Sequence, residues 1–369
     1  MTAPPAPGRP ARRYIAPVTR PLTRIQLSVI LTDACNMRCA YCTTAKRPVW
    51  IPAAYIDRIL ALLDTAPPVP LDVNFHGGEP TLAWPMVVRL AEGLAVLRST
   101  RRLSLNMCTN GTHLDRSRAA FLAAHGFDVR VSIDGRRRTH TRFRQPRPQE
   151  GIQAEALFSA TLAGLDALRA AGVTVAANMV VTPDTVHDLL SNAVFLVRRG
   201  LVHLVVSPVV GMPWKDRDLL ALDAQLSGLV PLWRRWMSRR APHQVEDLRR
   251  SILSEIDRAT YCIGERMNQP DARVLVIGPD GRIFGDEPDV RSEKALVVGH
   301  LDDCRDLTRL PAPPRTAFQL MFDREFYPPH VLRDVRRTHR LLRRHMRHLL
   351  RELFGETAPG PPASPAPAP

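Results

Sequence analysis

Lysine is scarce in this chain of 369 residues, and almost all of its positive charge is arginine. Lysine occurs only at Lys46, Lys215 and Lys294, whereas Lys and Arg together number 51 against 36 Asp and Glu, which gives a formal net charge of +15. Such a charge suits a nucleic acid or an anionic surface as a partner. An arginine bias in a chain rich in Ala and Pro is, however, typical of a coding preference. Solvated arginine faces are therefore favoured, and no nucleic-acid partner is expected.

Long apolar runs are also scarce. The segment 1–7 is rich in proline and lacks the apolar run of a secretory signal. No stretch is expected to be long and apolar enough to cross a membrane. Six cysteines in such a chain predict reduced thiols or metal ligands rather than a disulfide scaffold. We therefore expect a cytoplasmic protein without a membrane partner.

Short apolar runs alternate with helical patterns from Ile25 onward, which predicts an α/β fold with a parallel sheet. Six strands are predicted, at 25–32, 71–76, 103–109, 129–133, 173–181 and 201–209. Helices are predicted between them, at 53–63, 85–97, 114–124, 154–171 and 186–199. Right-handed crossovers between six such units favour a TIM-type (β/α)6 barrel, either full or partial. Active residues should then follow the C-terminal ends of the strands.

The alternation is lost after Leu219, and we interpret the segment that follows as a second, smaller module. An amphipathic helix through Trp233 and Trp236 precedes an apolar run at 272–277. The residues 279–281, Pro-Asp-Gly, then predict a β-hairpin turn.

Arginine gathers in two places that an acidic partner could contact. From 330 to 354, apolar residues recur at helical spacing opposite an arginine-rich face, which predicts a basic amphipathic helix. This helix could dock an acidic leader peptide, RNA or an anionic surface, or it could present a solvated face while packing on the barrel. Arg136, Arg137 and Arg138 follow the fourth strand and could meet an acidic peptide near the barrel mouth.

Three cysteines, Cys35, Cys39 and Cys42, follow the first predicted strand within one loop. Soft thiolates in this number suit zinc or an iron–sulfur cluster. Structural zinc needs a fourth protein ligand, and no second Cys or Cys/His pair stands nearby at the customary spacing. A cluster with three protein ligands leaves one iron open for a small molecule. The residues therefore favour a cluster over zinc and leave zinc as the alternative.

Small and polar residues follow the next three strands. The segment 75–80, Phe-His-Gly-Gly-Glu-Pro, ends the second strand, and its paired glycines allow close backbone approach while its Glu offers an acceptor to a cation. Thr-Asn-Gly-Thr at 109–112 and Ser-Ile-Asp-Gly at 132–135 follow the third and fourth strands. Taken singly, each segment is also ordinary turn chemistry.

The spacing C-x3-C-x2-C, with an aromatic residue before the last cysteine, resembles the signature of the radical SAM superfamily. The resemblance implies one [4Fe–4S] cluster on the three cysteines, with S-adenosylmethionine (SAM) bound at the open iron. The segments after strands two to four further resemble those of anaerobic sulfatase-maturing enzymes and SPASM-type peptide maturases. Asn178 is included among the cofactor-binding residues because it is polar within an apolar strand. The residues implied to bind the cofactor are Tyr41, Gly77, Gly78, Glu79, Pro80, Asn110, Ser132, Asp134, Arg144 and Asn178.

The second module resembles the start of a SPASM domain, which carries auxiliary clusters on about seven cysteines. Only Cys262 and Cys304 remain here, and Gly285 stands where a cysteine is expected. Two thiols cannot supply four cluster ligands, so we expect a degenerate SPASM-like module without clusters. The expected domains are a disordered Pro/Arg-rich tail at 1–22, a radical SAM barrel at 23–225, the SPASM-like module at 226–310, a C-terminal helical segment at 311–356 and a disordered Pro/Ala tail at 357–369.

Two further cysteines have two interpretations each. Cys108 precedes Asn110 on the third predicted strand, and Cys262 lies in the module expected to cover the barrel mouth. Either could donate a hydrogen atom to a substrate radical. Each could instead be a buried cysteine that behaves as a small apolar residue.

The resemblance implies that an electron from a flavodoxin or ferredoxin splits SAM into methionine and a 5′-deoxyadenosyl radical, which abstracts a substrate hydrogen. We expect the substrate to be a ribosomally synthesised peptide that is crosslinked or epimerised, because three loops look most like those of peptide maturases. One alternative is a small molecule or nucleoside in natural-product biosynthesis. Another is a non-catalytic iron–sulfur or zinc module that binds RNA through its arginines.

Overall fold

The structure is a computed structural model, and it describes residues 22–42, 44, 46–201, 203–240, 242–262, 272–285, 297–310 and 328–356. For residues 242, 243, 257, 258 and 260–262, it describes the backbone alone. The tails expected at 1–22 and 357–369 lie outside these ranges, apart from Leu22.

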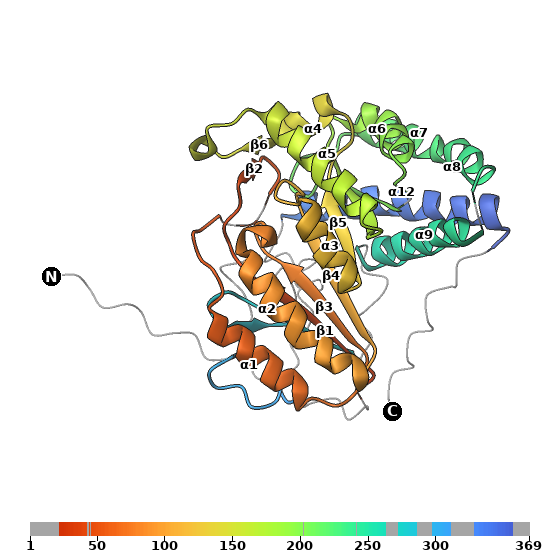
Figure 1. The fold of residues 1–369 in the computed structure, drawn as a ribbon. Coiled ribbons are helices and arrows are strands. Elements are labelled where there is room, and N and C mark those ends of the chain that lie inside the picture. Colours follow the sequence, from red (N-terminus) through yellow and green to blue (C-terminus); the bar gives the residue numbers. More distant parts are fainter. Residues whose placement is uncertain are drawn as a thin grey trace.

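One nine-stranded sheet organises the described chain (Figure 1). Six of its strands are parallel and adjacent in chain order, and their bounds differ from the predicted ones by two residues or fewer. They are β1 (Arg24–Ile30), β3 (Leu71–His76), β4 (Leu103–Thr109), β5 (Phe127–Ser132), β7 (Thr174–Val181) and β8 (His203–Pro208). Each is followed by at least one helix, as the sequence predicted.

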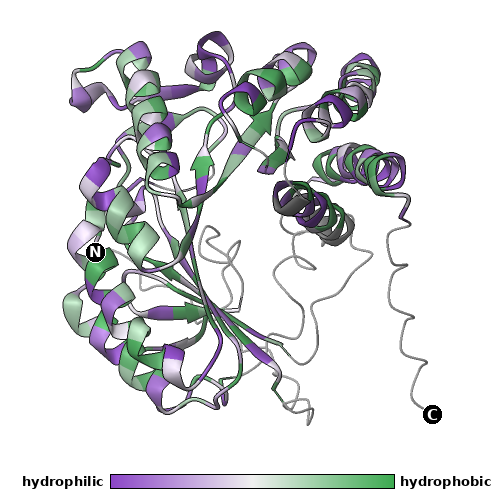
Figure 2. Cartoon of the chain, turned by 45° about the vertical axis from the view of Figure 1, so that its right-hand side comes forward, coloured by the Kyte–Doolittle hydropathy of each residue, from purple (hydrophilic) through white to green (hydrophobic). Residues whose placement is uncertain are grey.

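Helices cover the convex side of this curved sheet (Figure 2). The helices between β1 and β8 are α1 (Ala53–Asp64), α2 (Trp84–Ala95), α3 (Arg116–Ala124), α4 (Arg137–Phe143), α5 (Ala154–Ala170) and α6 (Leu189–Arg198). Four 3-10 turns adjoin them: η1 (Pro80–Ala83), η2 (Val96–Ser99), η3 (Pro148–Glu150) and η4 (Val186–Asp188). A separate two-stranded ribbon of β2 (Met37–Cys39) and β6 (Arg144–Pro146) was not predicted from the sequence.

The sheet continues beyond β1 into the C-terminal part of the chain. β9 (Ala272–Ile277) lies parallel to β1, and the predicted hairpin then leads to the antiparallel strands β10 (Arg282–Phe284) and β11 (Val297–His300). Within the described residues the sheet runs from β11 to β8, and these two edges do not pair. The six parallel strands and their helices thus form a partial (β/α)6 barrel. The expected domain ranges stay predictions, but residue 225 lies within a helix and β9 shares the barrel sheet.

Four helices follow β8: α7 (Asp216–Ser227), α8 (Leu229–Met237), α9 (Pro242–Cys262) and α12 (Pro329–Phe354). α12 is the predicted basic amphipathic helix, and it packs against the other three. Its residues Leu342 and Leu350 are fully buried. Several of its charged residues pair with these helices, including Arg337 with Asp216 and Glu352 with Arg234. These contacts support the interpretation of a face packed on the barrel.

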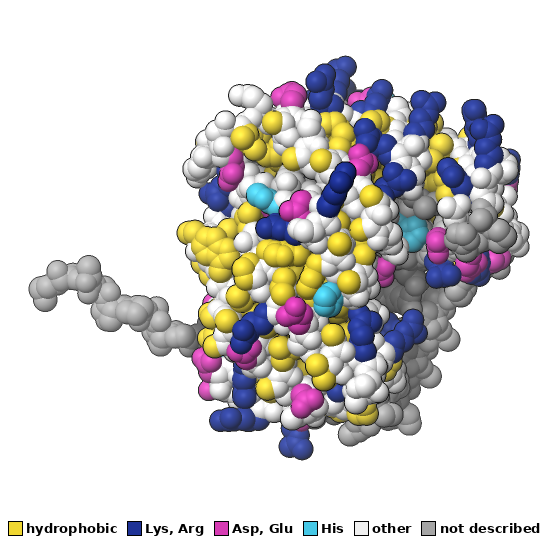
Figure 3. Space-filling model, in the orientation of Figure 1, with side chains coloured by type: hydrophobic (Ala, Val, Ile, Leu, Met, Phe, Trp, Pro, Cys, Tyr) yellow, Lys and Arg dark blue, Asp and Glu magenta, His cyan; other side chains and the backbone are white. Residues whose placement is uncertain are grey.

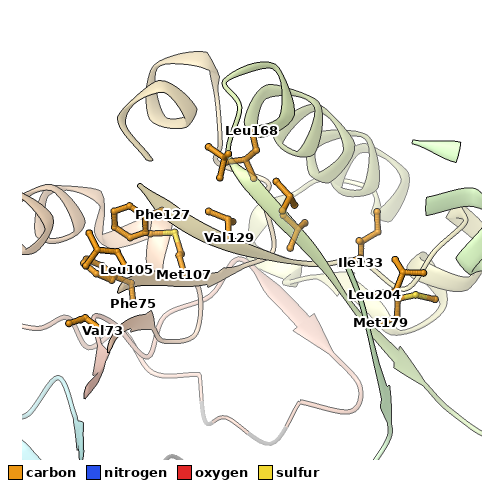
Figure 4. Close-up of a cluster of buried hydrophobic side chains, with 14 of the residues drawn as sticks. Val73, Phe75, Leu105, Met107, Phe127, Val129, Ile133, Leu168, Met179 and Leu204 are labelled. Carbon is orange, nitrogen blue, oxygen red and sulfur yellow. The ribbon is translucent and has the colours of Figure 1, made fainter. Parts of the chain in front are cut away.

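Alternation along the strands separates an apolar outer face from a polar inner face. Phe75 of β3 and Phe127 of β5 meet edge to face beneath the helices, with ring centroids 4.9 Å apart (Figure 4). Leu105 and Met107 of β4 complete this part of the core. On each of these strands, the residues that alternate with the core residues face the opposite side of the sheet, toward the inside of the barrel. The barrel interior is consequently lined largely by polar side chains.

One segment, Pro80–Ser99, is long and apolar enough to cross a membrane by length and composition. The expectation that no stretch would qualify was therefore wrong. Its central helix α2 buries Val87, Leu90 and Leu94 completely in the core shared with the sheet. A core helix passes the same test of length and composition. We therefore interpret the segment as part of the barrel's helical layer.

Candidate active site

The cysteine loop, residues 31–50, leaves β1 at its C-terminal end and is closed at its base like a hairpin. Thr32 forms an isolated bridge with Trp50, and the Thr32 hydroxyl donates to the carbonyl of Val49 at 2.7 Å. Within the loop, Asp33 pairs with Arg47 at 2.7 Å. Hydrogen bonds and ion pairs of this kind restrict the conformations that the loop can adopt. The loop thus holds its cysteines near the end of the barrel.

Two glycines that follow β3 lie in direct backbone contact with this loop. The N–H of Gly78 donates to the carbonyl of Thr32, and the N–H of Glu79 donates to that of Ala34, both at 2.8 Å. A Cβ atom on Gly77 would lie 2.4 Å from the Thr32 oxygen, and one on Gly78 would lie 2.3 Å from the Ala34 oxygen. No side chain fits in this space. The predicted close backbone approach is therefore made, in the described chain, by the cysteine loop.

Glu79 is a buried carboxylate that joins the turns after β3 and β4, and it is only 1% exposed. One oxygen accepts from the N–H and hydroxyl of Thr81 and from the hydroxyl of Thr109, at 3.1, 2.6 and 2.6 Å. The other oxygen accepts from the N–H of Asn110 at 2.7 Å. A carboxylate offers about four acceptor sites on its two oxygens, so the second oxygen retains capacity for another donor. Glu79 can therefore both fix the strand ends and accept from a bound ammonium.

Asn110 ties the loop after β4 to the cysteine loop. Its amide donates to the side-chain oxygen of Asn36 at 2.8 Å, and the Asn36 amide donates to the Thr112 hydroxyl at 2.9 Å. Asn36 lies between Cys35 and Cys39 in the sequence. The position of the cysteines consequently depends on the turn after β4.

The β2–β6 ribbon brings a buried ion pair to the other side of the same loop. Cys39 pairs in register with Arg144, whose guanidinium binds Asp134 through two hydrogen bonds of 2.9 and 2.8 Å. Asp134, 3% exposed, also accepts from the Tyr41 hydroxyl at 2.6 Å and from the N–H of Val180 at 2.9 Å. These four bonds fill its acceptor sites. The structure therefore places Asp134 behind Tyr41 and Arg144, where it positions them.

These loops enclose a cavity of about 240 Å³, called here the strand-end cavity. The residues predicted from the sequence that line it are Cys35, Cys39, Cys42, Cys108, Tyr41, Gly77, Gly78, Glu79, Asn110, Ser132, Arg144 and Asn178. Pro80 and Asp134 do not line it, and the side chain of Cys262 lies outside the described residues. The residues missed by the sequence analysis are Met37, Thr44, Lys46, His76, Thr109 and Val180. Strand alternation would have found His76 and Val180, which share the inner face with Asn178.

The three thiols differ in their protonation. Burial raises the pKa of Cys35 to about 11, although the charge of Lys46 opposes it. Burial also raises the pKa of Cys39, against the charge of Arg144. At the exposed Cys42, partial burial acts upward, but Lys46 and hydrogen bonds from Thr44 outweigh it, and the pKa is lowered. The cation of Lys46 thus favours thiolates on the loop that must supply them.

The donor set fits an iron–sulfur cluster. Three thiols from one loop line one cavity, and a cluster takes its cysteine ligands as thiolates on separate irons. Among the residues that the structure describes, no three His, Cys, Asp or Glu side chains lie close enough together to hold a single metal ion. This geometry suits a cluster better than the zinc alternative. Cys304, by contrast, is buried in the main hydrophobic core and acts there as an apolar residue.

Residues 29–196 match the family model described as the radical SAM superfamily. Curated relatives include GTP 3′,8-cyclase of Mycobacterium marinum, 34% identical over 221 residues that cover 56% of this chain and 58% of that protein. GTP 3′,8-cyclase 2 of Mycobacterium tuberculosis is 34% identical over 240 residues, which cover 60% of this chain and 62% of that protein. The matched part thus spans less than two thirds of the length of these relatives.

Similar solved structures include anSMEcpe, an anaerobic sulfatase-maturing enzyme, with bound AdoMet. Its TM-score is 0.60 at 16% identity, covering 78% of this chain and 80% of that chain. SuiB of Streptococcus suis has a TM-score of 0.54 at 15% identity, covering 80% of this chain and 67% of that chain. At these identities the likeness is one of fold.

Replacing Gly78 by Ala should release iron from the reconstituted protein, because the new methyl group must displace the backbone of Ala34 in the cysteine loop. Iron per chain and SAM cleavage should fall together. Gly172→Ala is the control, since Gly172 has a positive φ of 78° but no atom within 4 Å of an added Cβ. It should lose about 1 kcal/mol of stability and keep its iron. Full iron in Gly78→Ala would contradict the contact described above.

Alkylation of the metal-free protein should proceed in the order of exposure and pKa. Thiolates are the reactive form, so Cys42, with its lowered pKa, should react with iodoacetamide at a lower pH than Cys35, which should require a pH nearer 11. Peptide mass spectrometry at several pH values measures each rate. In urea the three rates should converge. Equal rates in the folded protein would exclude the buried position of Cys35.

Proposed function

We propose that this chain, whose residues 29–196 match the model of the radical SAM superfamily, is an enzyme that uses one [4Fe–4S] cluster and SAM to modify a ribosomally synthesised peptide by crosslinking or epimerisation. The observation that carries the proposal is the strand-end cavity, where three cysteines and the Gly-Gly-Glu segment face one another. When bound, the cluster and SAM supply a 5′-deoxyadenosyl radical after one electron arrives from a flavodoxin or ferredoxin.

The chain's own residues hold and orient these groups. Cys35, Cys39 and Cys42 are the proposed cluster ligands, and the free acceptor site on Glu79 suits the methionyl ammonium of SAM. Arg144, fixed by Asp134, presents a cation at the same cavity. Cys108 lies at the end of β4 where the cavity opens to the barrel interior, which supports its role as a hydrogen donor. Cys262 stays a second candidate.

A peptide substrate is supported by the fold and by the surface. A structure of SuiB has the precursor peptide SuiA bound, and one of anSMEcpe has the Cp18Cys peptide bound. On this chain, Arg136 already pairs with Asp188 at 3.2 Å and with Ser191. Arg137 and Arg138 are exposed on α4 and have no ion pair among the described residues. They suit an acidic leader peptide.

A nucleotide or another small molecule is the second candidate substrate, and the sequence likeness to GTP 3′,8-cyclases favours it. An RNA-binding module has less support. On the face shown in Figure 3, Lys and Arg side chains are scattered and Asp and Glu lie among them. Such a mixed surface lacks the continuous basic stripe that tracks a phosphate backbone.

Anaerobically reconstituted protein should hold roughly four irons, and the triple variant of Cys35, Cys39 and Cys42 to Ala should hold almost none. Iron and sulfide analysis with electron paramagnetic resonance measures this. The variant Cys304→Ala is the control and should keep its iron, because this thiol lies in the hydrophobic core. Roughly eight irons in the wild type would reveal an auxiliary cluster and refute the single-cluster assignment.

The double change of Arg137 and Arg138 to Glu should raise the apparent KM for a leader peptide rich in Asp and Glu about threefold to tenfold, and added salt should shrink this difference. SAM cleavage without substrate should not change. Arg116→Glu, at an exposed position on α3, is the control for a charge reversal away from α4. The assay is co-expression with any short peptide encoded beside the gene, followed by mass spectrometry for lost hydrogen or a D-residue. Unmodified peptides, together with 5′-deoxyadenosine formation stimulated by GTP, would favour the second candidate.

A further inference from the structure

A second and larger cavity, the inner chamber, occupies the concave side of the sheet and has a volume of about 860 Å³. His76, Cys108 and Asn178 line both this chamber and the strand-end cavity. The two spaces therefore meet at the C-terminal ends of β3, β4 and β7. A substrate that reaches the strand-end cavity from inside the barrel must pass through the chamber.

The chamber wall follows from strand alternation. On β5, Val129 and Val131 are buried against the helices, so Asp128 and Arg130 point inward. Neighbouring strands contribute amides at the same face, including Asn74 on β3. A wall of this kind is suited to a polar ligand rather than to an apolar one.

Most charged side chains in this wall already have a partner within the protein. Besides His76 and Cys108 at the junction, five charged or titratable side chains line the chamber: Asp128, Arg130, His203, Asp247 and Arg250. Asp247 and Arg250 lie 3.9 Å apart on α9. Asp128 accepts from the Thr174 hydroxyl and lies near His203. Arg130 alone among these described residues has no hydrogen bond or ion pair.

Arg130 is also well placed relative to the strand-end cavity. It pairs in register with Cys108 of β4, and side chains of paired residues on one face of a sheet lie about 5 Å apart at Cβ. A guanidinium binds carboxylate or phosphate through two parallel hydrogen bonds. An anion held there would therefore lie beside the junction of the two cavities.

We propose that Arg130 anchors an anionic group of the substrate, a carboxylate or a phosphate, inside the inner chamber. This inference rests on the proposed function, since it takes the chamber as the substrate site, and it narrows the substrate class. In a peptide, the anion is an Asp or Glu side chain or a terminal carboxylate close to the modified residue. In a nucleotide, it is the phosphate.

Calorimetric titration in the presence of SAM tests the proposal with two pairs of probes. N-acetyl-glutamate amide against N-acetyl-glutamine amide tests a carboxylate, and GTP against guanosine tests a phosphate. The wild type should bind the anionic member of one pair about 10- to 100-fold more tightly than its neutral counterpart. Arg130→Gln should abolish that preference, and Arg130→Lys should retain part of it. Arg116→Gln, on the outer surface, should behave as the wild type.

The ratio of the two affinities separates an anchoring role of Arg130 from a structural one. If Arg130→Gln merely destabilised the chamber, the anionic and the neutral probe would both bind more weakly, by the same factor. Iron content and SAM cleavage without substrate should stay normal in Arg130→Gln. If the wild type showed no preference for either anion, or Arg130→Gln kept the preference, the proposal would be overturned. A wild type without iron or SAM cleavage would instead refute the proposed function, while the titration would still report on Arg130.

Discussion

The close approach between the end of β3 and the cysteine loop is the constraint on which the rest of the site depends. Gly77 and Gly78 let two backbone segments meet at hydrogen-bonding distance, with no room for a side chain between them. The cysteines therefore take their position from the sheet as well as from contacts within their own loop. A parallel barrel sheet makes this possible, because it brings the ends of consecutive strands to one edge.

Two buried carboxylates then hold the edge together. Glu79 gathers donors from the turns after β3 and β4, and Asp134 gathers donors from the cysteine loop, β6 and β7 through Tyr41, Arg144 and Val180. Charge-assisted hydrogen bonds of this kind are strong, and removing either carboxylate would leave several buried donors unmatched. Both residues thus serve the fold, and the chemical role of Glu79 is a proposal, because a sequence motif alone does not separate a structural role from a chemical one.

The sequence predicted the six parallel strands, the basic helix and the gathering of cysteines with the Gly-Gly-Glu segment, because periodicity and chain order determine them. It could not predict the β2–β6 ribbon, since three-residue strands carry no periodic signal. Nor could it show that Asp134 faces Arg144 rather than the cavity, because that choice depends on packing between distant loops. The role of Lys46 was missed for the same reason. Roles of single residues at the cofactor stay predictions.

The position of β9 beside β1 affects how the chain folds during synthesis. The strand that carries the cysteine loop lies between β3 and β9, so one of its edges is completed by residues some 240 positions later in the chain. During synthesis, that edge would expose unpaired backbone groups until β9 emerges, and an exposed strand edge invites pairing with other chains. Aggregation at the first strand therefore competes with the arrival of β9, and a chaperone that shields this edge would favour folding.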